Sequence, residues 1–301
     1  MDASEETQRR VRRAIAWVQA VPATVSRVRS GEQVSTAFGD VGSSVAGPVS
    51  PFDLTGLNAL VTGGNRGLGR AITLELAAAG ADVAMGVRRT ADAADVVAAV
   101  RRLGRRGYAV EMDVTDLELC RRSIDAVIAD LGHLDILVNN AGGGIGGAAF
   151  DVSEADFDAV WALNTRSTFF ISQHAARHMR TRGHGAIVNV ASQAGLVALP
   201  GESSYCISKA AVIHMTKVHA VEWGASGIRV NAVAPTFIET DGTSQALSDP
   251  DFRADTIERI AALHRIGTPR EVSAAVLFLA SPAASLITGT TLTIDGGWTT
   301  R

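Results

Sequence analysis

From Phe52 onward the sequence alternates between short apolar runs and longer segments with the 3.6-residue periodicity of amphipathic helices. Strands that are apolar throughout must be covered on both faces, so this alternation predicts a seven-stranded parallel sheet between two helical layers. The predicted architecture is a single doubly wound α/β domain. The expected strands are Asn58–Thr62, Asp82–Val87, Tyr108–Asp113, Asp135–Asn139, Ala186–Ala191, Ile228–Val233 and Thr290–Ile294. The expected helices include Ala71–Ala79, Asp116–Leu131, Glu154–Met179, Tyr205–Trp223 and Arg270–Leu279.

The first fifty residues follow a different pattern. Glu5–Val21 has helical periodicity, with apolar residues on one side and arginines on the other. Ser30–Ser50 is rich in Gly, Ser and Val and has no sustained period. We therefore expect an N-terminal extension over residues 1–50, made of an amphipathic helix and a flexible linker, followed by the α/β domain over residues 51–301. The alternative is that this helix docks on a partner or on a membrane surface.

Composition excludes several classes of protein. With a net charge of −3, the chain has no global positive field that would favour nucleic acid or anionic membranes. No apolar run approaches the roughly 18 residues that a membrane span requires. Cys120 and Cys206 are too few for a disulfide framework or a zinc site, and a cytoplasmic location is expected. The pair His174 and His178 lacks further ligands at metal-binding spacing, so no metal site is predicted.

A glycine-rich turn joins the first predicted strand to the following helix. Its sequence, Thr62-Gly63-Gly64-Asn65-Arg66-Gly67-Leu68-Gly69, allows a tight turn and lets a pyrophosphate approach the free N–H groups of the helix. The glycine spacing differs from the common G-x-G-x-x-G of dinucleotide folds, but the position between strand and helix favours a dinucleotide site. The residues of this turn expected to contact the cofactor are Thr62, Gly63, Asn65, Arg66, Gly67, Leu68 and Gly69.

The end of the second predicted strand indicates which dinucleotide is bound. An acidic residue there usually binds the ribose hydroxyls of NAD, whereas this chain has Val87 followed by Arg88 and Arg89. Guanidinium groups match phosphate oxygens, so we expect NADP(H) rather than NAD(H), with Arg66 as a further contact. The alternative is that these arginines are only solvated. Asp113, followed by Val114, closes the third strand and is expected to bind the adenine amino group.

Three polar residues form a candidate catalytic group. Tyr205 and Lys209 are four residues apart on a predicted helix, which places them on one face. A neighbouring ammonium and an oxidised nicotinamide would lower the pKa of the tyrosine from its usual value near ~10. Ser192 ends the fifth predicted strand and is placed to hydrogen-bond a substrate oxygen. The chain contains only two tyrosines and two lysines, so this juxtaposition is unlike a chance match.

These motifs, taken together, resemble the short-chain dehydrogenase/reductase family, whose fold is Rossmann-like. The resemblance extends from Phe52 to the C-terminus and includes the glycine turn and Asn139-Asn140-Ala141-Gly142. It implies that Asn164, Ser192, Tyr205 and Lys209 are the catalytic residues. Tyr205 would be the general acid/base, Lys209 would also bind the nicotinamide ribose, and Asn164 would hold a water in the proton relay.

The same resemblance implies the remaining cofactor contacts and the quaternary structure. The segment that begins at Arg229 and ends at Pro235 matches the family segment leading to the nicotinamide. The further contacts implied are Asn140, Ala141, Gly142, Pro235, Ile238 and Thr240. Thr236 stands where the family usually has glycine, which would stiffen the entrance to the substrate loop. Members usually form homotetramers or dimers, and we expect a homo-oligomer.

The sequence also favours one substrate class. Residues 239–265 follow the sixth strand, where the family has its substrate lid, and the C-terminal stretch resembles members acting on sugar acids and polyols. The expected cavity residues include Gly143, Gly144, Gln193, Gly195 and Glu202. The expected function is oxidoreduction of a sugar acid, polyol or related small polar substrate. A β-ketoacyl reductase is the first alternative, and a non-catalytic NADP(H)-sensing protein of the same fold is the second.

Overall fold

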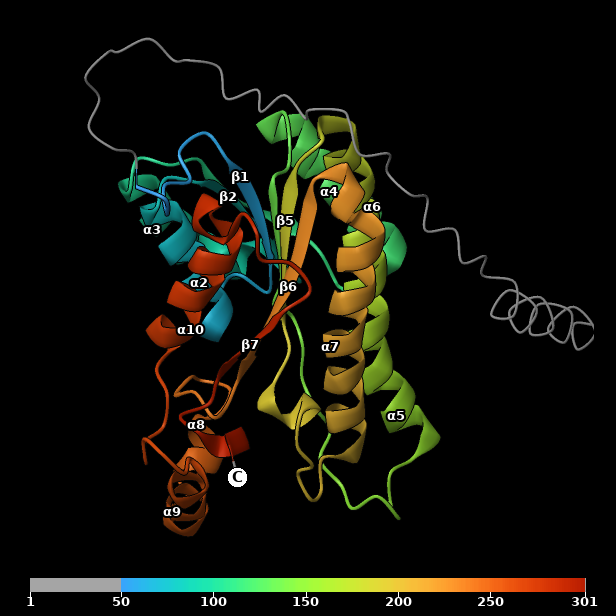
Figure 1. Cartoon of the computed structure of the whole chain (residues 1–301), viewed down its shortest axis with the longest axis vertical. Coiled ribbons are helices and arrows are strands. Elements are labelled where there is room, and N and C mark those ends of the chain that lie inside the picture. The colour runs from blue at the N-terminus through green and yellow to red at the C-terminus, as the bar shows by residue number, and fades with distance from the viewer. Residues whose placement is uncertain (1–49, 301) are drawn as a thin grey trace, which may run out of the picture. The chain divides into compact units, whose positions relative to one another are not determined.

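A computed structural model describes residues 50–300, so the helix and linker predicted within residues 1–50 lie outside the described residues, apart from Ser50. The described part contains a seven-stranded sheet with the order β3-β2-β1-β4-β5-β6-β7, in which every pair is parallel (Figure 1). The strands are β1 (Asn58–Thr62), β2 (Asp82–Val87), β3 (Gly107–Glu111), β4 (Ile136–Asn139), β5 (Gly185–Val190), β6 (Ile228–Pro235) and β7 (Thr291–Ile294). The doubly wound, Rossmann-like α/β fold is therefore confirmed, and the strand order reverses between β1 and β4.

Helices cover both faces of the sheet, as the apolar strands require (Figure 1). On one face lie α2 (Gly67–Ala78), α3 (Ala94–Arg102) and α10 (Pro269–Ala280). On the other face lie α4 (Leu117–Leu131), α6 (Ser167–Arg182) and α7 (Ser203–Trp223). Successive residues of a strand alternate between the two cores: Ala59 and Val61 of β1 belong to the first, and Leu60 to the second.

One predicted helix is interrupted in the structure. The segment predicted as a helix over Glu154–Met179 consists of α5 (Glu154–Trp161), a π-helical turn (Ala162–Arg166) and α6. Such a turn inserts one residue into the helical repeat and leaves carbonyl groups without their usual partners. Since Asn164 lies in this turn, the interruption occurs at a predicted catalytic residue.

A helical lid follows β6 at the carboxyl edge of the sheet. It contains α8 (Ser244–Leu247) and α9 (Pro250–Arg259), and it returns to the sheet through α10 (Figure 1). Helix α9 begins where the Asp249 side chain accepts hydrogen bonds from the N–H groups of Asp251 and Phe252, with Pro250 at the first helical position. The lid lies at the edge of the sheet where ligands bind in this architecture.

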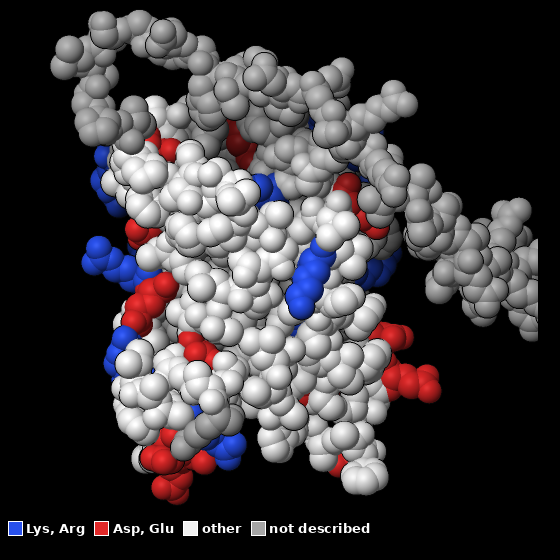
Figure 2. Space-filling model, in the orientation of Figure 1, with Lys and Arg blue, Asp and Glu red and all other residues white. Residues whose placement is uncertain are grey.

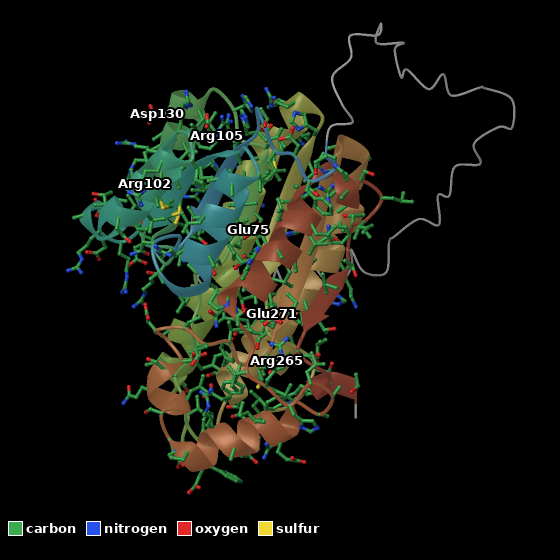
Figure 3. The ribbon with its side chains drawn as sticks, turned by 90° about the vertical axis from the view of Figure 1, so that its left-hand side faces the viewer. Glu75, Arg102, Arg105, Asp130, Arg265 and Glu271 are labelled. Carbon is green, nitrogen blue, oxygen red and sulfur yellow. The ribbon has the colours of Figure 1, made fainter. Side chains whose placement is uncertain are left out.

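Glu271 stabilises the segment that leads from the lid to α10. Its carboxylate accepts hydrogen bonds from the guanidinium of Arg265 (Figure 3) and from the N–H of Thr268. The hydrogen bond from Arg265, followed by that from Thr268, lowers the pKa of Glu271 from 4.5 to about 2. A lowered pKa means that the stabilisation is complete above pH 4.5 and is lost as the pH falls toward 2.

We expect Glu271→Gln to lower the free energy of unfolding by about 1 kcal/mol at pH 7, because the helix cap and the ion pair weaken together. Chemical denaturation at pH 7 and at pH 2.5 measures this difference, which should shrink at the lower pH. Glu222→Gln, which removes an exposed charge from α7, is the matched control. An equal loss of unfolding free energy in both variants would contradict the stabilising role of Glu271.

No helix among residues 50–300 is both long and apolar enough to span a membrane. Within the same range, no group of three or more His, Cys, Asp or Glu side chains is arranged to hold a metal ion. His174, considered as a metal ligand, instead lies 2.7 Å from Asp125 of α4, measured from Nε2 to Oδ1.

Candidate active site

The glycine turn after β1 has the geometry of an anion site. Gly63 and Gly67 have φ angles of +63° and +51°, which side chains disfavour. A Cβ on Gly69 would lie 2.0 Å from the carbonyl oxygen of Gly63, so only glycine permits this approach of helix to turn. Helix α2 has no side-chain cap and no acidic residue in its first turn. Its first N–H groups are therefore available to a phosphate.

Two polar residues connect this turn to the end of β4. The Oγ1 of Thr62 accepts hydrogen bonds of 3.0 Å from the N–H groups of Asn140 and Ala141. The Asn140 amide in turn donates to the carbonyl oxygens of Thr62, at 2.9 Å, and Gly63, at 3.3 Å. These bonds fix the ends of the two central strands, where the strand order reverses. Thr62 and Asn140 therefore hold the glycine turn against the end of β4 by binding each other.

The residues predicted to select the cofactor lie beside the ends of β2 and β3. Arg89 is engaged in an ion pair with Asp92, at 2.9 Å between Nη2 and Oδ2. The side chain of Arg88 forms no hydrogen bond or ion pair with another described residue, and it lies close enough to Asp113 to help lower the pKa of that carboxyl. The main cause of that lowered pKa is the hydrogen bond from Thr115. Arg88 is thus an exposed cation that is free to meet an anion at this edge.

Ile238 and Thr240 close the cradle from the opposite side. Ile238 is buried and its backbone forms a parallel bridge with Gly267. A Cβ added to Gly67 would lie 3.7 Å from the Cβ of Thr240, so the segment after β6 lies against the glycine turn. The fold thus brings together predicted cofactor residues from β1, β2, β4 and β6.

Tyr205 and Ser192 meet at the same edge of the sheet. Tyr205 is the third residue of α7, and Ser192 follows β5. The Ser192 hydroxyl is hydrogen-bonded to the tyrosine, accepts the N–H of Ala194 and donates to the side-chain oxygen of Gln193. Burial raises the pKa of Tyr205, and the bond with Ser192 opposes that effect. The predicted lowering of its pKa is therefore not a property of the protein alone.

Lys209 is buried below Tyr205, and its Nζ lies 5.7 Å from the centre of the tyrosine ring. The ammonium donates to the carbonyl of Val190 at 2.8 Å, and burial lowers its pKa from 10.5 to about 8. A Cβ on Gly142 would lie 3.2 Å from this nitrogen, so the ammonium reaches the glycine-rich loop after β4. It has two remaining N–H donors for a ribose hydroxyl or a water.

Both polar atoms of the Asn164 side chain are hydrogen-bonded. Its Oδ1 accepts the N–H of Gly143, and its Nδ2 donates to the Gly143 carbonyl and to Ser208 Oγ. The side chain therefore fixes the loop after β4 against α7. Its backbone carbonyl accepts the hydroxyl of Thr168 and retains a second lone pair, to which a relay water would bind.

A cavity of about 660 Å³ opens beside Tyr205 and Ser192, beneath the lid. Four of the five predicted cavity residues line it: Gly143, Gly144, Gln193 and Glu202. The exception, Gly195, packs against the backbone of Lys209 and Ala210, since its Cβ would be 2.7 Å from the Lys209 carbonyl carbon. Thr236 also lines the cavity, and its buried Oγ1 has no partner among the described residues.

The lid supplies cavity residues that the sequence did not single out. Phe237 contacts Phe252 of α9 and Trp298, with ring centres 5.5 Å and 5.8 Å apart, and these three rings form an aromatic wall. Asp255 and Arg259 of α9 complete the lining. The Asp249-Pro250 cap in the sequence could have located α9, but no sequence signal places its side chains over Tyr205.

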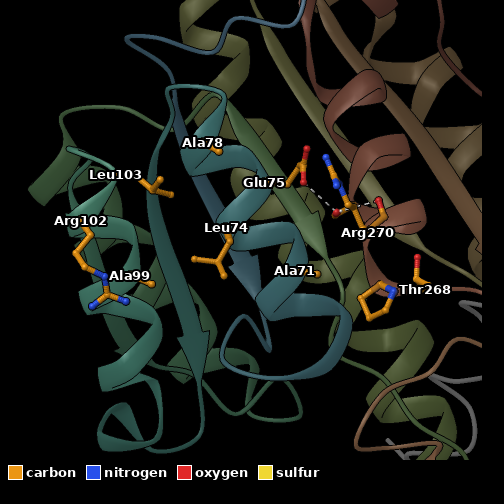
Figure 4. A pocket seen from close by; sticks show the side chains of 11 residues that line it. Ala71, Leu74, Glu75, Ala78, Ala99, Arg102, Leu103, Thr268 and Arg270 are labelled. Carbon is orange, nitrogen blue, oxygen red and sulfur yellow. Dashed lines mark hydrogen bonds between the residues drawn. The ribbon is translucent and has the colours of Figure 1, made fainter.

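A second cavity, of about 670 Å³, lies between α2, α3 and α10 (Figure 4). Leu74 and Leu103 provide much of its apolar wall, and Glu75 lies on its far side, where its carboxylate accepts a 3.4 Å hydrogen bond from Ser273. None of the predicted catalytic residues lines this cavity.

Comparison with known proteins agrees with this geometry. Residues 63–299 match the family model described as enoyl-(acyl carrier protein) reductase. The chain is 41% identical over 253 residues to D-threitol dehydrogenase from Mycolicibacterium smegmatis, covering 83% of this chain and 95% of the relative. It is 38% identical to 2-dehydro-3-deoxy-D-gluconate 5-dehydrogenase from Escherichia coli, covering 84% and 99%.

Solved structures agree as well. Gluconate 5-dehydrogenase from Burkholderia cenocepacia, in complex with NADP and tartrate, superposes with a TM-score of 0.81 at 34% identity, covering 84% of this chain and 99% of that one. A 7α-hydroxysteroid dehydrogenase complexed with NADH superposes with a TM-score of 0.80 at 35% identity, covering 84% and 98%. Dehydrogenases of alcohols and sugars thus share this chain's whole described fold.

Proposed function

Because this chain belongs to the short-chain dehydrogenase/reductase family, we propose that it is an NADP(H)-dependent enzyme that interconverts a secondary alcohol and a ketone on a polyol, sugar acid or related small molecule. The observation that carries the proposal is the juxtaposition of Ser192, Tyr205 and Lys209 at one end of the cavity beneath the lid. The relatives support an oxidoreductase acting on CH–OH groups.

The protein's part in the reaction is to hold the substrate and move one proton. Ser192 and Tyr205 bind the substrate oxygen, and the tyrosine oxygen takes the hydroxyl proton during oxidation or returns it during reduction. A nicotinamide held by the glycine turn would supply the hydride chemistry at the carbinol carbon, as acceptor in oxidation and as donor in reduction. Lys209 stabilises the tyrosinate electrostatically and binds the nicotinamide ribose, and Asn164 holds the relay water at its carbonyl. Each turnover therefore exchanges one hydride and one proton.

We assign the cofactor cradle to the glycine turn and the arginines beside it. The uncapped start of α2 would bind the pyrophosphate, and Arg88 would bind the extra phosphate of NADP. Asp113 and Val114 would border the adenine, while the backbone around Ala141, Gly142 and Ile238 would border the nicotinamide side.

Turnover with NADP⁺ and NAD⁺ on four- to six-carbon polyols, sugar acids and β-hydroxyacyl thioesters tests the proposed function directly. Oxidation of a polyol or sugar acid with NADP⁺ is the expected result. Turnover confined to the thioesters would favour the β-ketoacyl reductase alternative, and cofactor binding without any turnover would favour a sensor.

Arg88→Ala should raise the Kd for NADPH by about 10- to 100-fold and leave the Kd for NADH almost unchanged, because a charge-assisted bond to phosphate is lost. Quenching of tryptophan fluorescence measures both constants. Arg89→Ala should have a smaller effect, since Asp92 already neutralises that side chain. Preference of the unmodified protein for NADH would contradict the cofactor assignment.

We also propose that the enzyme is a homo-oligomer, a homotetramer or dimer, that associates through α5 and α7. The side chains of Phe157 and Trp161 stack on α5 while remaining partly exposed, and Val221 of α7 is 85% exposed. Figure 2 shows that the face over α7 and α10 carries few charged side chains. Light scattering measures the mass in solution, and a monomer would contradict the proposal.

A further inference from the structure

The charges of the ionisable side chains that line the active-site cavity do not cancel. Besides Tyr205, the lining contains three ionisable groups: Glu202, Asp255 and Arg259. The Arg259 guanidinium donates from Nε to Asp255 at 2.7 Å, and both side chains are about half exposed. The one cation of the lining is therefore neutralised by a carboxylate of its own helix. Glu202 remains as an uncompensated negative charge.

Glu202 lies where a substrate bound to Tyr205 would extend. It precedes α7 and is three residues before Tyr205, and its carboxylate oxygens would be 3.2 Å and 3.3 Å from Cβ atoms on Gly144 and Gly146. The glycines of this loop thus leave room for the carboxylate. Its negative charge also contributes to the raised pKa of Tyr205, after burial and against the Ser192 hydrogen bond.

No described residue donates a hydrogen bond to the Glu202 carboxylate, which is half-buried and does not cap α7. Burial raises its pKa. A partly desolvated carboxylate without donors is stabilised by hydroxyl groups that replace its lost water, and it is destabilised by a second anion nearby. The cavity therefore offers a hydroxyl-binding acceptor on one wall and no free cation on any described wall.

From this charge arrangement we propose that the cavity selects neutral polyols and their ketoses over sugar acids, and that Glu202 accepts a hydrogen bond from a substrate hydroxyl beside the reacting carbon. The proposal rests on the proposed function and narrows its substrate class. Glu202 is a specificity-determining residue here, because it contacts substrate and takes no part in the proton transfer.

Matched substrate pairs that differ only at the terminal carbon test the proposal. Threitol and threonate, and galactitol and galactonate, are compared by kcat/KM with saturating NADP⁺. We expect kcat/KM to favour each polyol by about 10-fold or more, since one hydrogen bond to a charged group is gained and one repulsion avoided. A preference for either sugar acid would overturn the proposal.

Glu202→Gln keeps the shape of the side chain and removes its charge. We expect about a 10-fold rise in KM for the polyols and little change in their kcat. The ratio of kcat/KM for a polyol to kcat/KM for its sugar acid should fall by at least that factor. Glu239→Gln is the matched control, because Glu239 is exposed, outside the cavity lining and 3.9 Å from Arg253. An unchanged ratio in Glu202→Gln, or an equal change in the control, would overturn the role of Glu202.

Binding separates failure of this proposal from failure of the proposed function. Calorimetric titration of threitol and threonate into the enzyme with NADPH measures selection without turnover. If neither compound is oxidised, the proposed function fails, yet tighter binding of threitol would still support charge selection by Glu202. Tighter binding of threonate would overturn it.

Discussion

Replacement of Tyr205 by Phe is expected to lower kcat by about 100- to 10,000-fold, the range attributed to general acid–base catalysis. The substitution removes the hydroxyl that is hydrogen-bonded to Ser192 and keeps the ring, whose centre lies 5.7 Å from the Lys209 ammonium. Binding of NADPH should persist, because the glycine turn is untouched. Steady-state kinetics and a cofactor titration on the same preparation measure the two effects separately.

The chain provides a matched control for this experiment in its other tyrosine. Tyr108 donates its hydroxyl to the Val127 carbonyl at 3.3 Å, away from the cavity. Tyr108→Phe should therefore leave kcat unchanged and cost only a fraction of the stability of one hydrogen bond. If Tyr205→Phe were as active as Tyr108→Phe, Tyr205 would not be the general acid/base.

Substitution of Gly69 by Ala is expected to raise the Kd for NADPH by more than about 100-fold and to lower the melting temperature. The new Cβ would lie 2.0 Å from the Gly63 oxygen and 2.6 Å from Asn140 Nδ2, so the backbone of the turn must move. Overpacking of this kind commonly costs about 1 to 3 kcal/mol, and here the displaced atoms form the cradle itself. Thermal unfolding with and without NADPH measures both consequences.

Gly224→Ala is the control for this substitution. Gly224 has a negative φ of −56°, and a Cβ there would meet nothing within 4 Å. Its replacement should leave cofactor binding unchanged, and the loss of glycine's freedom in the unfolded chain should keep stability equal or slightly raise it. Wild-type NADPH affinity in Gly69→Ala would show that the turn does not hold the cofactor as proposed.

Local sequence patterns were sufficient to predict the fold class. The strands β1 and β2 begin and end at the predicted residues, because buried parallel strands are apolar throughout and bounded by polar residues. The predicted bounds of the other strands differ by one or two residues. Helix α3, Ala94–Arg102, was not named among the predicted helices, although its buried residues Val96 and Val100 recur at helical spacing.

The sequence by itself determined which residues can perform the chemistry: a glycine turn that tolerates positive φ, and a Tyr–Lys pair one helical turn apart. Only the tertiary structure decided how these groups are used. It directed the Asn164 side chain to Gly143 and Ser208, neutralised Arg259 with Asp255, and left Glu202 without a donor. The reason is physical: φ angles and helical spacing are local properties, whereas burial, pKa and charge balance depend on segments distant in sequence that meet at one edge of the sheet.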